Sequence, residues 1–484
     1  MKDTERLANL FHKIDGEMPL QVSALPGAGS ARKYFRLQSC EDKCIGVAAD
    51  SRVDAEAFIS LASTLRHNGV RVPKVIGIDS GDCRFYLQND LGTESLFDLL
   101  PKDGRKPSEE VVKLIEEAMK SLAHLHRIPS GEWEDDLRYG AFDSRQIQWD
   151  LNYYKYEFLR PLAIDFDENA LEDDFSRLIR DIHTLQLPGD EFMYRDFQSR
   201  NIMIKDGEPW MIDFQGARKG PGLYDVVSFL WQAKARFPEE FRREMLEVYL
   251  NVMDSGTLDG RRPIGEEGKE KRRSGYWLFA LLRTLQTLGA YGLRGLIEKK
   301  AHFIESIPLG IENLQTLLGY GVLDRYPELK STAERVMEDI RFRPSEDLFD
   351  GLTVKVFSFS YKKGYPADYS GNGGGFMFDC RGMHNPGRYQ EYKSLTGMDL
   401  PVIEFLESRG EVGPFVDRAI EIMKPTVERY IQRGFRSLQI GFGCTGGQHR
   451  SVYCAEVCAR ILKENFPQIQ VILCHREQSV TRIL

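Results

Sequence analysis

Hydrophobic and polar residues alternate in short runs near the start of the chain, a pattern typical of strands with one buried face. The runs cover residues 33–37, 44–48, 74–78 and 84–87. Between the second and third runs, Phe58, Leu61 and Leu65 recur at helical spacing, which predicts one helix over 54–68. Residues 1–92 are therefore predicted to form a small sheet with one helix.

In residues 93–325 the apolar residues recur at the longer spacing of a helix. Apolar positions recur at helical spacing over 108–127, twice within 149–181, from 226 onward and again over 237–320. This segment is predicted to be a mainly helical lobe. Residues 326–350 are charged, helical at first and broken at Arg343-Pro344, and we interpret them as a linker.

Strand and helix patterns alternate again in residues 351–484, which predicts a separate, smaller α/β domain. Buried strands are expected at 352–360, 377–379, 437–442 and 468–474, with helices at 415–433 and 451–464. The composition changes at the same place. All five Trp precede Gly351, and the segment from Gly351 onward has a net charge of +4 in a chain of net charge −8.

The composition narrows the possible locations and partners. A chain of 484 residues is too long for one ordinary core. It contains no run of eighteen apolar residues and no apolar segment after its charged start, so we expect neither a membrane span nor a signal peptide. The eight cysteines form no C-x-x-C pair, which favours free thiols, no zinc site and a cytoplasmic location. A net charge of −8 argues against a dedicated nucleic-acid binder.

Three polar residues occur at a spacing that is typical of phosphoryl transfer. Arg195-Asp196 is followed by Asn201, and Asp213 ends an apolar run. Residues 201–204 and 210–213 are predicted to pair as a hairpin around Asp206-Gly207, which gathers these side chains at one end of a sheet. In such a set, one carboxylate takes the acceptor hydroxyl proton, while an amide and a second carboxylate hold the Mg²⁺ that bridges the phosphates.

With these motifs in place, residues 1–325 resemble the aminoglycoside phosphotransferase/choline kinase-like family, and most closely its branch of N-acetylmuramate/N-acetylglucosamine anomeric kinases. Shared stretches are 194–201, 213–215, 220–225 and 90–92. The resemblance implies a two-lobed, protein-kinase-like α+β fold that uses ATP and Mg²⁺. It assigns catalysis to Asp196 and Arg195 and metal binding to Asn201 and Asp213. Its predicted nucleotide-binding residues are Gly27, Gly29, Ser30, Arg32, Lys33, Gln88 and Asp90.

The chain departs from that family in the residues that bind the phosphates of the nucleotide. Kinases place a Lys on the third strand to pair the phosphates with a helix Glu. Residues 44–50 contain no Lys, although Glu56 is placed for the Glu role. Arg32, Lys33 and Arg36 are alternative sources of the positive charge. The gap leaves open a second interpretation, a nucleotide-binding pseudo-kinase that acts as a metabolite-sensing protein.

A second candidate site lies at 443–451, where a strand, a glycine turn and a helix start follow one another. Free backbone amides and the helix dipole suit an anion there, and Arg450 adds charge. Cys444 and Arg450 also have the C-x₅-R spacing of phosphotyrosine-type phosphatases. An ordinary structural turn, an anion-binding loop and a phosphatase loop all remain open, with anion binding favoured.

Residues 352–477 resemble the C-terminal domain of the RNase adapter family RapZ, through 378–381, 385–386, 395–397, 443–451 and 475–476. The resemblance implies oligomerisation and a pocket for an amino-sugar phosphate such as glucosamine-6-phosphate. Either His449 or His475 could bind phosphate as imidazolium, and the structural alternatives are a capped helix turn for His449 and a strand-end residue for His475. We expect no RNA binding, because the Lys/Arg-rich tail linked to it is missing. The predicted pocket residues are Asp379, Arg381, Cys444, Thr445, Gly446, His449, Arg450 and His475.

Together these patterns predict an ATP-dependent kinase that phosphorylates a hydroxyl of an amino sugar, with the anomeric hydroxyl as one candidate, in cell-wall sugar salvage. The C-terminal domain would sense an amino-sugar phosphate. The alternatives are the pseudo-kinase, a bifunctional kinase with a C-x₅-R phosphatase, and an RNA adapter.

Overall fold

The computed structural model describes residues 2–25, 32–40, 42–101, 104–255, 263–338, 349, 351–366, 375–478 and 480–484. The chain divides into two compact units. The first comprises Met1–Ala290 with Leu309–Glu334, and the second comprises Tyr291–Pro308 with Arg335–Leu484. Each unit is described by itself. Within the described residues, no helix is both long and apolar enough to cross a membrane.

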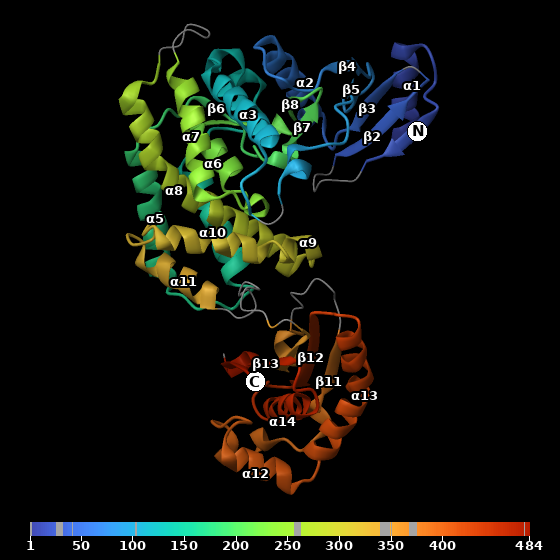
Figure 1. The fold of residues 1–484 in the computed structure, drawn as a ribbon, viewed down its shortest axis with the longest axis vertical. Coiled ribbons are helices and arrows are strands. Elements are labelled where there is room, and N and C mark those ends of the chain that lie inside the picture. The colour runs from blue at the N-terminus through green and yellow to red at the C-terminus, as the bar shows by residue number, and fades with distance from the viewer. Residues whose placement is uncertain are drawn as a thin grey trace. The chain divides into compact units, whose positions relative to one another are not determined.

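The first lobe of unit 1 is a five-stranded antiparallel sheet of order β1-β2-β3-β5-β4 with two helices (Figure 1). Its elements are α1 (Asp3–Asp15), β1 (Gln21–Ala24), β2 (Lys33–Gln38), β3 (Lys43–Ala48), α2 (Arg52–His67), β4 (Val75–Ile78) and β5 (Phe85–Asn89). The strands agree with the alternating runs. The prediction of a single helix was wrong, because α1 also forms. Leu7, Leu10 and Phe11 give it an apolar face that packs on Phe35 and Leu37.

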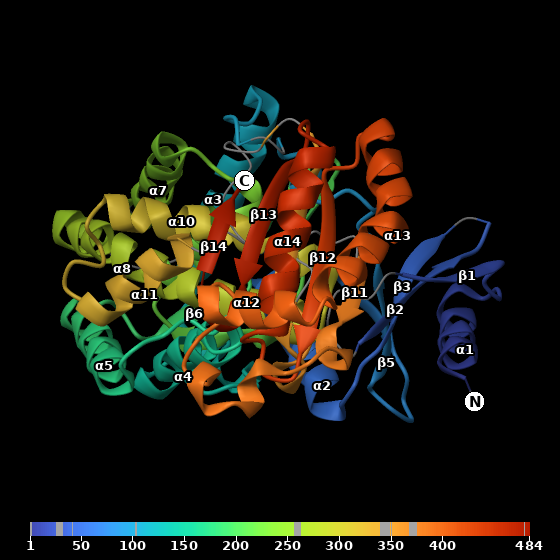
Figure 2. The ribbon, with the colours of Figure 1, turned by 90° about the horizontal axis from the view of Figure 1, so that it is seen from below.

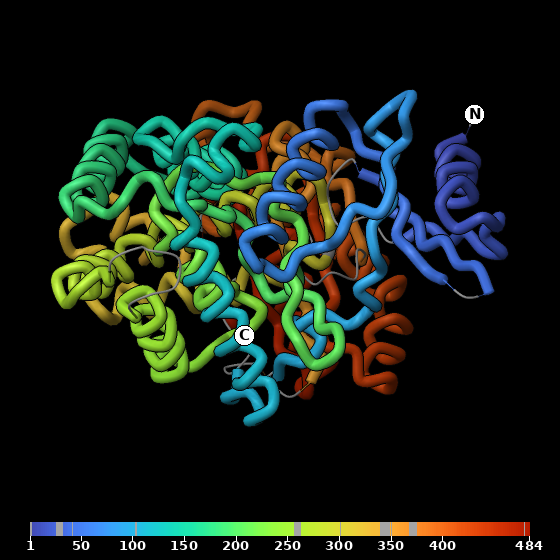
Figure 3. Tube along the Cα trace, turned by 90° about the horizontal axis from the view of Figure 1, so that it is seen from above, coloured from blue at the N-terminus to red at the C-terminus, as the bar shows by residue number. Residues whose placement is uncertain are grey.

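The second lobe of unit 1 is mainly helical, as predicted. Its elements are α3 (Glu109–Arg127), α4 (Ser144–Tyr154), α5 (Glu168–Thr184), β6 (Glu191–Met193), β7 (Ile202–Lys205), β8 (Glu208–Met211), β9 (Arg218–Gly220), α6 (Leu223–Leu230), α7 (Glu239–Asp254), α8 (Gly265–Tyr291), α10 (Ile307–Gly319) and α11 (Pro327–Glu338). In Figure 3 the green hairpin of β7 and β8 runs beside the blue first lobe. The hydrogen bond from Met211 N to Arg71 O, 2.8 Å long, joins them.

The predicted hairpin turn has the backbone that its sequence favours. Asp206 and Gly207 have φ of 54° and 75°, and β7 and β8 pair antiparallel on either side of them. Two residues with positive φ form the tight turn that matches the twist of a hairpin. The turn therefore returns the chain so that Asn201 and Asp213 lie at the same end of the hairpin.

Unit 2 is built on a sheet of order β11-β12-β10-β13-β14. Its elements are α9 (Ala301–Ile304), β10 (Thr353–Ser360), β11 (Phe376–Asp379), α12 (Leu400–Ser408), α13 (Val412–Gln432), β12 (Ser437–Cys444), α14 (Arg450–Asn465), β13 (Gln470–His475) and β14 (Val480–Ile483). The first four strands of the order are parallel, and β14 is antiparallel to β13. Helices α13 and α14 pack on one face of this sheet (Figure 2), where the main apolar core lies.

The start of α11 belongs to unit 1. Glu328 N and Leu329 N donate to Asp174 Oδ2 in α5, at 2.7 and 2.9 Å, and Tyr326 donates its hydroxyl to Asp181. The domain limits given above from the sequence, 1–92, 93–325, 326–350 and 351–484, stay predictions.

Candidate functional site

The loop that carries Asp196 is held in an unusual backbone conformation. Arg195 has φ of 77°, a left-handed value that costs energy for a residue with a Cβ. Asp225, at the start of α6, accepts the main-chain N–H groups of Tyr194 and Arg195 at 2.6 and 2.8 Å. Because both bonds close on one buried carboxylate, they stabilise the strained turn and fix the direction in which Asp196 leaves it.

Asp196, Asn201 and Asp213 are connected through Asn201. Its Nδ2 donates to the main-chain oxygen of Asp196 at 2.8 Å. Its own main-chain oxygen accepts from Ile212 N at 2.9 Å, one residue before Asp213. The hydroxyl of Tyr194 also donates to Ile212 O. The structure thus brings together the three polar residues that the sequence predicted to act together.

Asp196 and Asp213 both have oxygens available to a ligand. The Asp196 side chain is 48% exposed, and its nearest cation is Arg283 Nη2 at 3.8 Å. Asp213 is half-buried, has φ of 71° and accepts from Gln215 Nε2 at 2.6 Å. Among the described residues, no three His, Cys, Asp or Glu side chains are grouped to hold a metal. One carboxylate and one amide fit Mg²⁺, which usually takes few protein ligands beside phosphate oxygens and water.

Arg195 is placed for support rather than for contact with a substrate. Its side chain is 14% exposed, and Nη2 donates to Asp150 Oδ1 at 2.6 Å. The guanidinium also lies over the rings of Phe142 and Tyr224, at 5.1 and 4.9 Å from their centroids. Its predicted catalytic role is therefore best understood as holding the loop, with Asp150 as the partner that sequence reasoning missed.

His126 is a second supporting residue that the sequence did not reveal. Its Nε2 lies 3.1 Å from Asp225 Oδ2, and its Nδ1 lies 2.9 Å from the Tyr249 hydroxyl. A Cβ at Gly222 would lie 2.3 Å from His126 Nδ1, so only glycine fits there. The Gly220-Pro-Gly222 stretch before Asp225 is the one sequence signal for this close approach.

The residues predicted to bind the nucleotide lie only partly within the described residues. Gly27, Gly29 and Ser30 lie outside the described residues. Asp90 is buried and bonds Arg36 through both carboxylate oxygens, at 2.7 and 3.1 Å, and Gln88 is buried beside it on β5. The prediction that Glu56 takes the role of the kinase helix Glu was wrong. Its carboxylate is 53% exposed and pairs with Arg52 on the solvent side of α2.

In unit 2, the predicted pocket residues meet where parallel strands end. Asp379 ends β11, Cys444 ends β12 and His475 ends β13. In the register, Asp379 lies opposite Gly443, Ser360 opposite Cys444, and Ser358 opposite His475. The carboxyl ends of parallel strands share one edge of a sheet, the usual place for ligand binding in α/β domains.

Cys444 accepts hydrogen bonds from the turn that follows it. The Ser451 Oγ lies 3.1 Å from Cys444 Sγ, and Gly447 N donates to Sγ at 3.2 Å. Burial raises the pKa of this thiol, but the bonds from Ser451, Gly447 and Gln448 outweigh it, so the pKa is lowered. Thr445 and Gly446 are exposed, and their part of the turn faces outward.

Arg450 and His449 bond to neighbouring main-chain carbonyls. Arg450 Nη1 donates to Arg381 O and Met383 O at 3.0 and 2.9 Å, and His449 Nε2 donates to Tyr392 O at 2.8 Å. Gly397 N donates to Gln448 O, and a Cβ on Gly397 would lie 2.2 Å from His449 O. The Leu395-Thr396-Gly397 stretch thus packs directly on the anion loop.

Asp379 and Arg381 form an ion pair at the same edge. Arg381 donates to both Asp379 oxygens, at 2.9 and 2.6 Å, and its guanidinium lies 4.3 Å from the centroid of Tyr361. Both side chains are about half exposed, at 45% and 51%. Arg381 can therefore turn toward a bound anion, whereas Arg450 cannot do so without losing its two carbonyl partners.

Of the two interpretations of His475, the structure favours a buried strand-end residue over an imidazolium that binds phosphate. The ring is fully buried, with Nδ1 2.9 Å from Ser358 Oγ and Nε2 3.0 Å from Glu456 Oε1. Burial lowers its pKa to about 4. A neutral ring fits these partners, since one nitrogen donates to the carboxylate and the other accepts from the hydroxyl.

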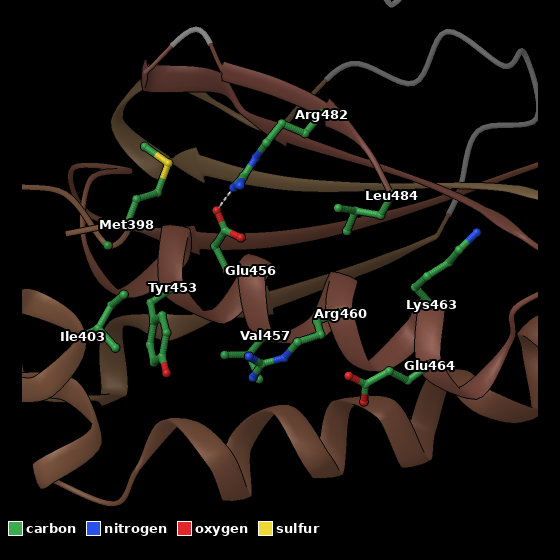
Figure 4. A pocket seen from close by; sticks show the side chains of 11 residues that line it. Met398, Ile403, Tyr453, Glu456, Val457, Arg460, Lys463, Glu464, Arg482 and Leu484 are labelled. Carbon is green, nitrogen blue, oxygen red and sulfur yellow. Dashed lines mark hydrogen bonds and ion pairs between the residues drawn. The ribbon is translucent and has the colours of Figure 1, made fainter. Parts of the chain in front are cut away.

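A cavity of about 500 Å³ opens on the outer side of α14 (Figure 4). Tyr453, Glu456 and Val457 of α14 line it, and the ion pair of Glu456 with Arg482 of β14 crosses its upper side. Cys444, Thr445 and Gly446 are not in its lining. It is therefore separate from the predicted anion loop.

Comparison with known families decides the identity of unit 1. Residues 22–264, half of the chain, match the family described as "Phosphotransferase enzyme family". The chain belongs to this phosphotransferase family. Residues 352–479 match the family described as "RapZ C-terminal domain". Both resemblances drawn from the motifs are confirmed.

Two curated relatives share part of the chain. A nucleotide-binding protein of Thermotoga sp. strain RQ2 is 37% identical over 121 residues, which is 25% of this chain and 41% of the relative. One of Acidithiobacillus ferrooxidans is 36% identical over 136 residues, 28% of this chain and 43% of the relative. The phosphotransferase thus spans about two fifths of the length of these relatives.

Two solved structures are similar to most of the chain. The choline kinase of Cryptosporidium parvum Iowa II is 14% identical, with a TM-score of 0.46, 68% of this chain and 99% of that chain covered. The putative aminoglycoside phosphotransferase of Ralstonia eutropha JMP134 is 14% identical, with a TM-score of 0.45, and 69% and 98% covered. In this phosphotransferase, the loop of Asp196 and its buried supports form the candidate active site.

Proposed function

We propose that this protein transfers the γ-phosphoryl group of ATP to a hydroxyl of an amino sugar in the cytoplasm, with the anomeric hydroxyl as the favoured acceptor and cell-wall sugar salvage as its setting. The observation that carries the proposal is the half-exposed carboxylate of Asp196 on a loop that Asn201 connects, by main-chain bonds, to the residue before Asp213. A family of phosphotransferases supplies the reaction class.

In this proposal, Asp196 accepts the proton of the sugar hydroxyl as its oxygen attacks the γ-phosphorus in line. Phosphoryl transfer depends mainly on position and charge, so a rigid loop is its chief requirement. The two bonds to Asp225 and the bond from Asn201 meet that requirement. Asp213 and the amide oxygen of Asn201 are the residues that would hold Mg²⁺, which when bound neutralises charge on the phosphates.

We further propose that the RapZ-like domain binds an amino-sugar phosphate and adjusts the kinase. The exposed Thr445-Gly446 turn, the half-exposed ion pair of Arg381 and the start of α14 support an anion site at the strand ends. The proposal also includes association of chains through this domain, the property implied by the resemblance.

One assay tests the kinase. ADP release is measured with amino sugars, choline and aminoglycosides as acceptors, for the natural protein, Asp196→Asn and Asp206→Asn. Asp206 lies exposed in the β7–β8 turn, where Asn also tolerates positive φ, so it controls for the loss of one carboxylate. We expect an amino sugar to be turned over and only Asp196→Asn to lose activity. Tight nucleotide binding without turnover of any acceptor would instead support the pseudo-kinase.

Calorimetry tests the C-terminal site. Glucosamine-6-phosphate is titrated into the full chain, with glucosamine as the control for the phosphate group. We expect binding that Arg381→Gln weakens and Arg433→Gln, an exposed change at the end of α13, leaves intact. Equal heats for the sugar and its phosphate, or for both variants, would contradict the proposal.

A second activity is supported by Cys444. Its lowered pKa and its contacts with Ser451 and Gly447 are those of a nucleophilic thiolate at a helix start. Hydrolysis of p-nitrophenyl phosphate that Cys444→Ser abolishes would establish a phosphatase. Cys444 is buried, with an exposed fraction of 3%, so we favour anion binding without hydrolysis over this alternative activity.

A further inference from the structure

The only lysine of β3 is Lys43, which is exposed and opens the strand opposite Gln38, at the far end from Ala48 and Arg32. No lysine follows it in the strand, and the alternation of β2 restricts which other cation can take the role of the kinase strand lysine. Lys33, Phe35 and Leu37 point to the α1 side, where the latter two pack on Leu7 and Leu10. Successive residues of a strand face opposite ways. Tyr34 and Arg36 therefore face the other side, and Arg32, one residue before β2, continues that series.

Two of the three candidate cations are already engaged. Lys33 Nζ is 66% exposed and lies 2.8 Å from Asp3 Oδ2 of α1. Arg36 binds Asp90 through two nitrogens and also donates to Gly92 O at 2.9 Å, which fastens β2 to the segment joining the two lobes. Arg36 is therefore held by Asp90, and Lys33 lies on the α1 side of the sheet, on the opposite face from Arg32.

Arg32 is buried and yet incompletely bonded. Its exposed fraction is 5%, and Nη2 donates to the main-chain oxygen of Asp54, in the first turn of α2, at 3.2 Å. The guanidinium lies 5.6 Å from the ring centroid of Phe58. Its Nη1 is buried and has no hydrogen-bond partner within the described residues. Leaving such a donor unpaired is costly, and buried polar groups in proteins are nearly always satisfied.

Further unpaired polar atoms lie on the same face of the sheet. Across the ladder, Tyr34 is opposite Val47 and Val47 is opposite Tyr86, so the two tyrosines share a face. Gln88, two residues after Tyr86 on β5, shares it as well. The hydroxyl of Tyr86 and Oε1 of Gln88 are both buried without a partner among the described atoms. A polar ligand on this face would satisfy them.

This face adjoins the proposed metal ligand. Phe58 stacks on Tyr86 and on Phe214, with centroids 5.3 and 4.8 Å apart, and Phe214 follows Asp213 in the chain. Burial raises the pKa of Tyr34, the charge of Arg32 lowers it and that of Asp213 raises it again. The cation and the carboxylate thus act on the same phenol from nearby positions.

We propose that Arg32 binds the phosphates of the nucleotide in place of the strand lysine, oriented by the Asp54 carbonyl of α2 instead of by a helix glutamate. The inference rests on the proposed kinase function and names its phosphate-binding cation. An arginine at the start of β2 can take this role because its fork offers several donors, one directed at α2 and another at an anion. The register that pairs Lys33 with Ala48 places Ala49, a small residue at the end of the third strand, next to Arg32.

The test compares Arg32→Met with Arg52→Met, which removes an exposed arginine of α2. Binding of ATP, ADP and adenosine is measured by calorimetry, and turnover is measured against ATP and against the acceptor. We expect Arg32→Met to weaken ATP binding about ten- to hundredfold, the effect of losing a charged hydrogen bond, while adenosine binding is unchanged. Arg32→Lys should recover part of the ATP affinity, and Arg52→Met should behave as the natural protein.

The outcomes separate this inference from the proposed function. If the natural protein turns over no acceptor but its ATP affinity falls in Arg32→Met, the kinase proposal fails and the Arg32 assignment stands. If Lys33→Met weakens ATP binding and Arg32→Met does not, the assignment is overturned. An equal loss of adenosine and ATP affinity in Arg32→Met, with a lowered melting temperature, would show a structural role and also overturn it.

Discussion

Asp225 Oδ2 lies 3.1 Å from His126 Nε2 and 2.6 Å from Tyr194 N, so one buried carboxylate joins α3 to the loop of Asp196. Its second oxygen accepts from Arg195 N. None of these groups is expected to touch a substrate. They hold the loop of Asp196 in its observed conformation.

Asp225→Asn should loosen the loop without changing any proposed ligand. The amide keeps one acceptor and sets its NH₂ group against a main-chain N–H, so we expect a loss of about 2–3 kcal/mol in the free energy of unfolding and a lower kcat. Urea unfolding followed by tryptophan fluorescence reports on unit 1, because all five Trp lie before Gly351. The exposed change Asp206→Asn is the control, and equal stability of both variants would refute the support by Asp225.

Gly222→Ala tests the same contact from the other side. The added Cβ would lie 2.3 Å from His126 Nδ1 and would displace the ring from Asp225. Overpacking of this kind costs about 1–3 kcal/mol. Gly216→Ala, whose Cβ would meet nothing within 4 Å, is the matched control. A melting temperature for Gly222→Ala equal to that of the control would mean that His126 does not depend on this glycine.

Gly397→Ala should weaken phosphate binding in unit 2 without altering a proposed ligand. The methyl group would lie 2.2 Å from His449 O, at the end of the anion loop. We expect the loop to shift and the affinity for glucosamine-6-phosphate to fall in calorimetry. Gly413→Ala, in the first turn of α13 with nothing within 4 Å, should leave it unchanged. Unchanged affinity in both would place the sugar phosphate elsewhere.

Ser451→Ala should raise the pKa of the Cys444 thiol. The hydroxyl that now bonds Sγ at 3.1 Å favours the thiolate, and its removal leaves burial to act against the charge. The thiolate absorbance of the natural protein, corrected with Cys444→Ser, should appear at lower pH than in Ser451→Ala. Coincident titrations would show that the helix start alone sets the pKa.

His475 should make unit 2 less stable in mild acid. Its pKa is about 4 in the folded chain against about 6.5 for a free side chain, so between these values the unfolded chain binds a proton that the folded chain does not. Stability is complete above pH 6.5 and declines as the pH falls toward 4, by up to about 3 kcal/mol. Calorimetric melting at pH 7 and pH 5 should show a smaller loss in His475→Gln, which keeps both hydrogen bonds and cannot be charged. The same loss in both proteins would assign the acid sensitivity to other groups.

The local patterns predicted most elements because they arise from short-range effects. Alternation predicted β2, β3 and the β4–β5 hairpin, and Asp206-Gly207 predicted the turn between β7 and β8. The order Asp196, Asn201, Asp213 also predicted the site, since a hairpin brings its two ends together. The N-terminal helix α1 was missed, although Leu7, Leu10 and Phe11 have helical spacing.

The sequence by itself therefore determined the two families, the fold class and the reaction class, and it predicted the residues proposed to carry the chemistry. Only the tertiary structure decided which of Arg32, Lys33 and Arg36 lacks a full set of partners among the described residues. The answer depends on the face of β2 and on Asp3 and Asp90, which lie far from β2 in sequence. The tertiary structure likewise decided that Glu56 faces solvent and that His475 is neutral. The charge and direction of a side chain depend on its burial and on partners that are distant in sequence. A local sequence pattern indicates neither of these.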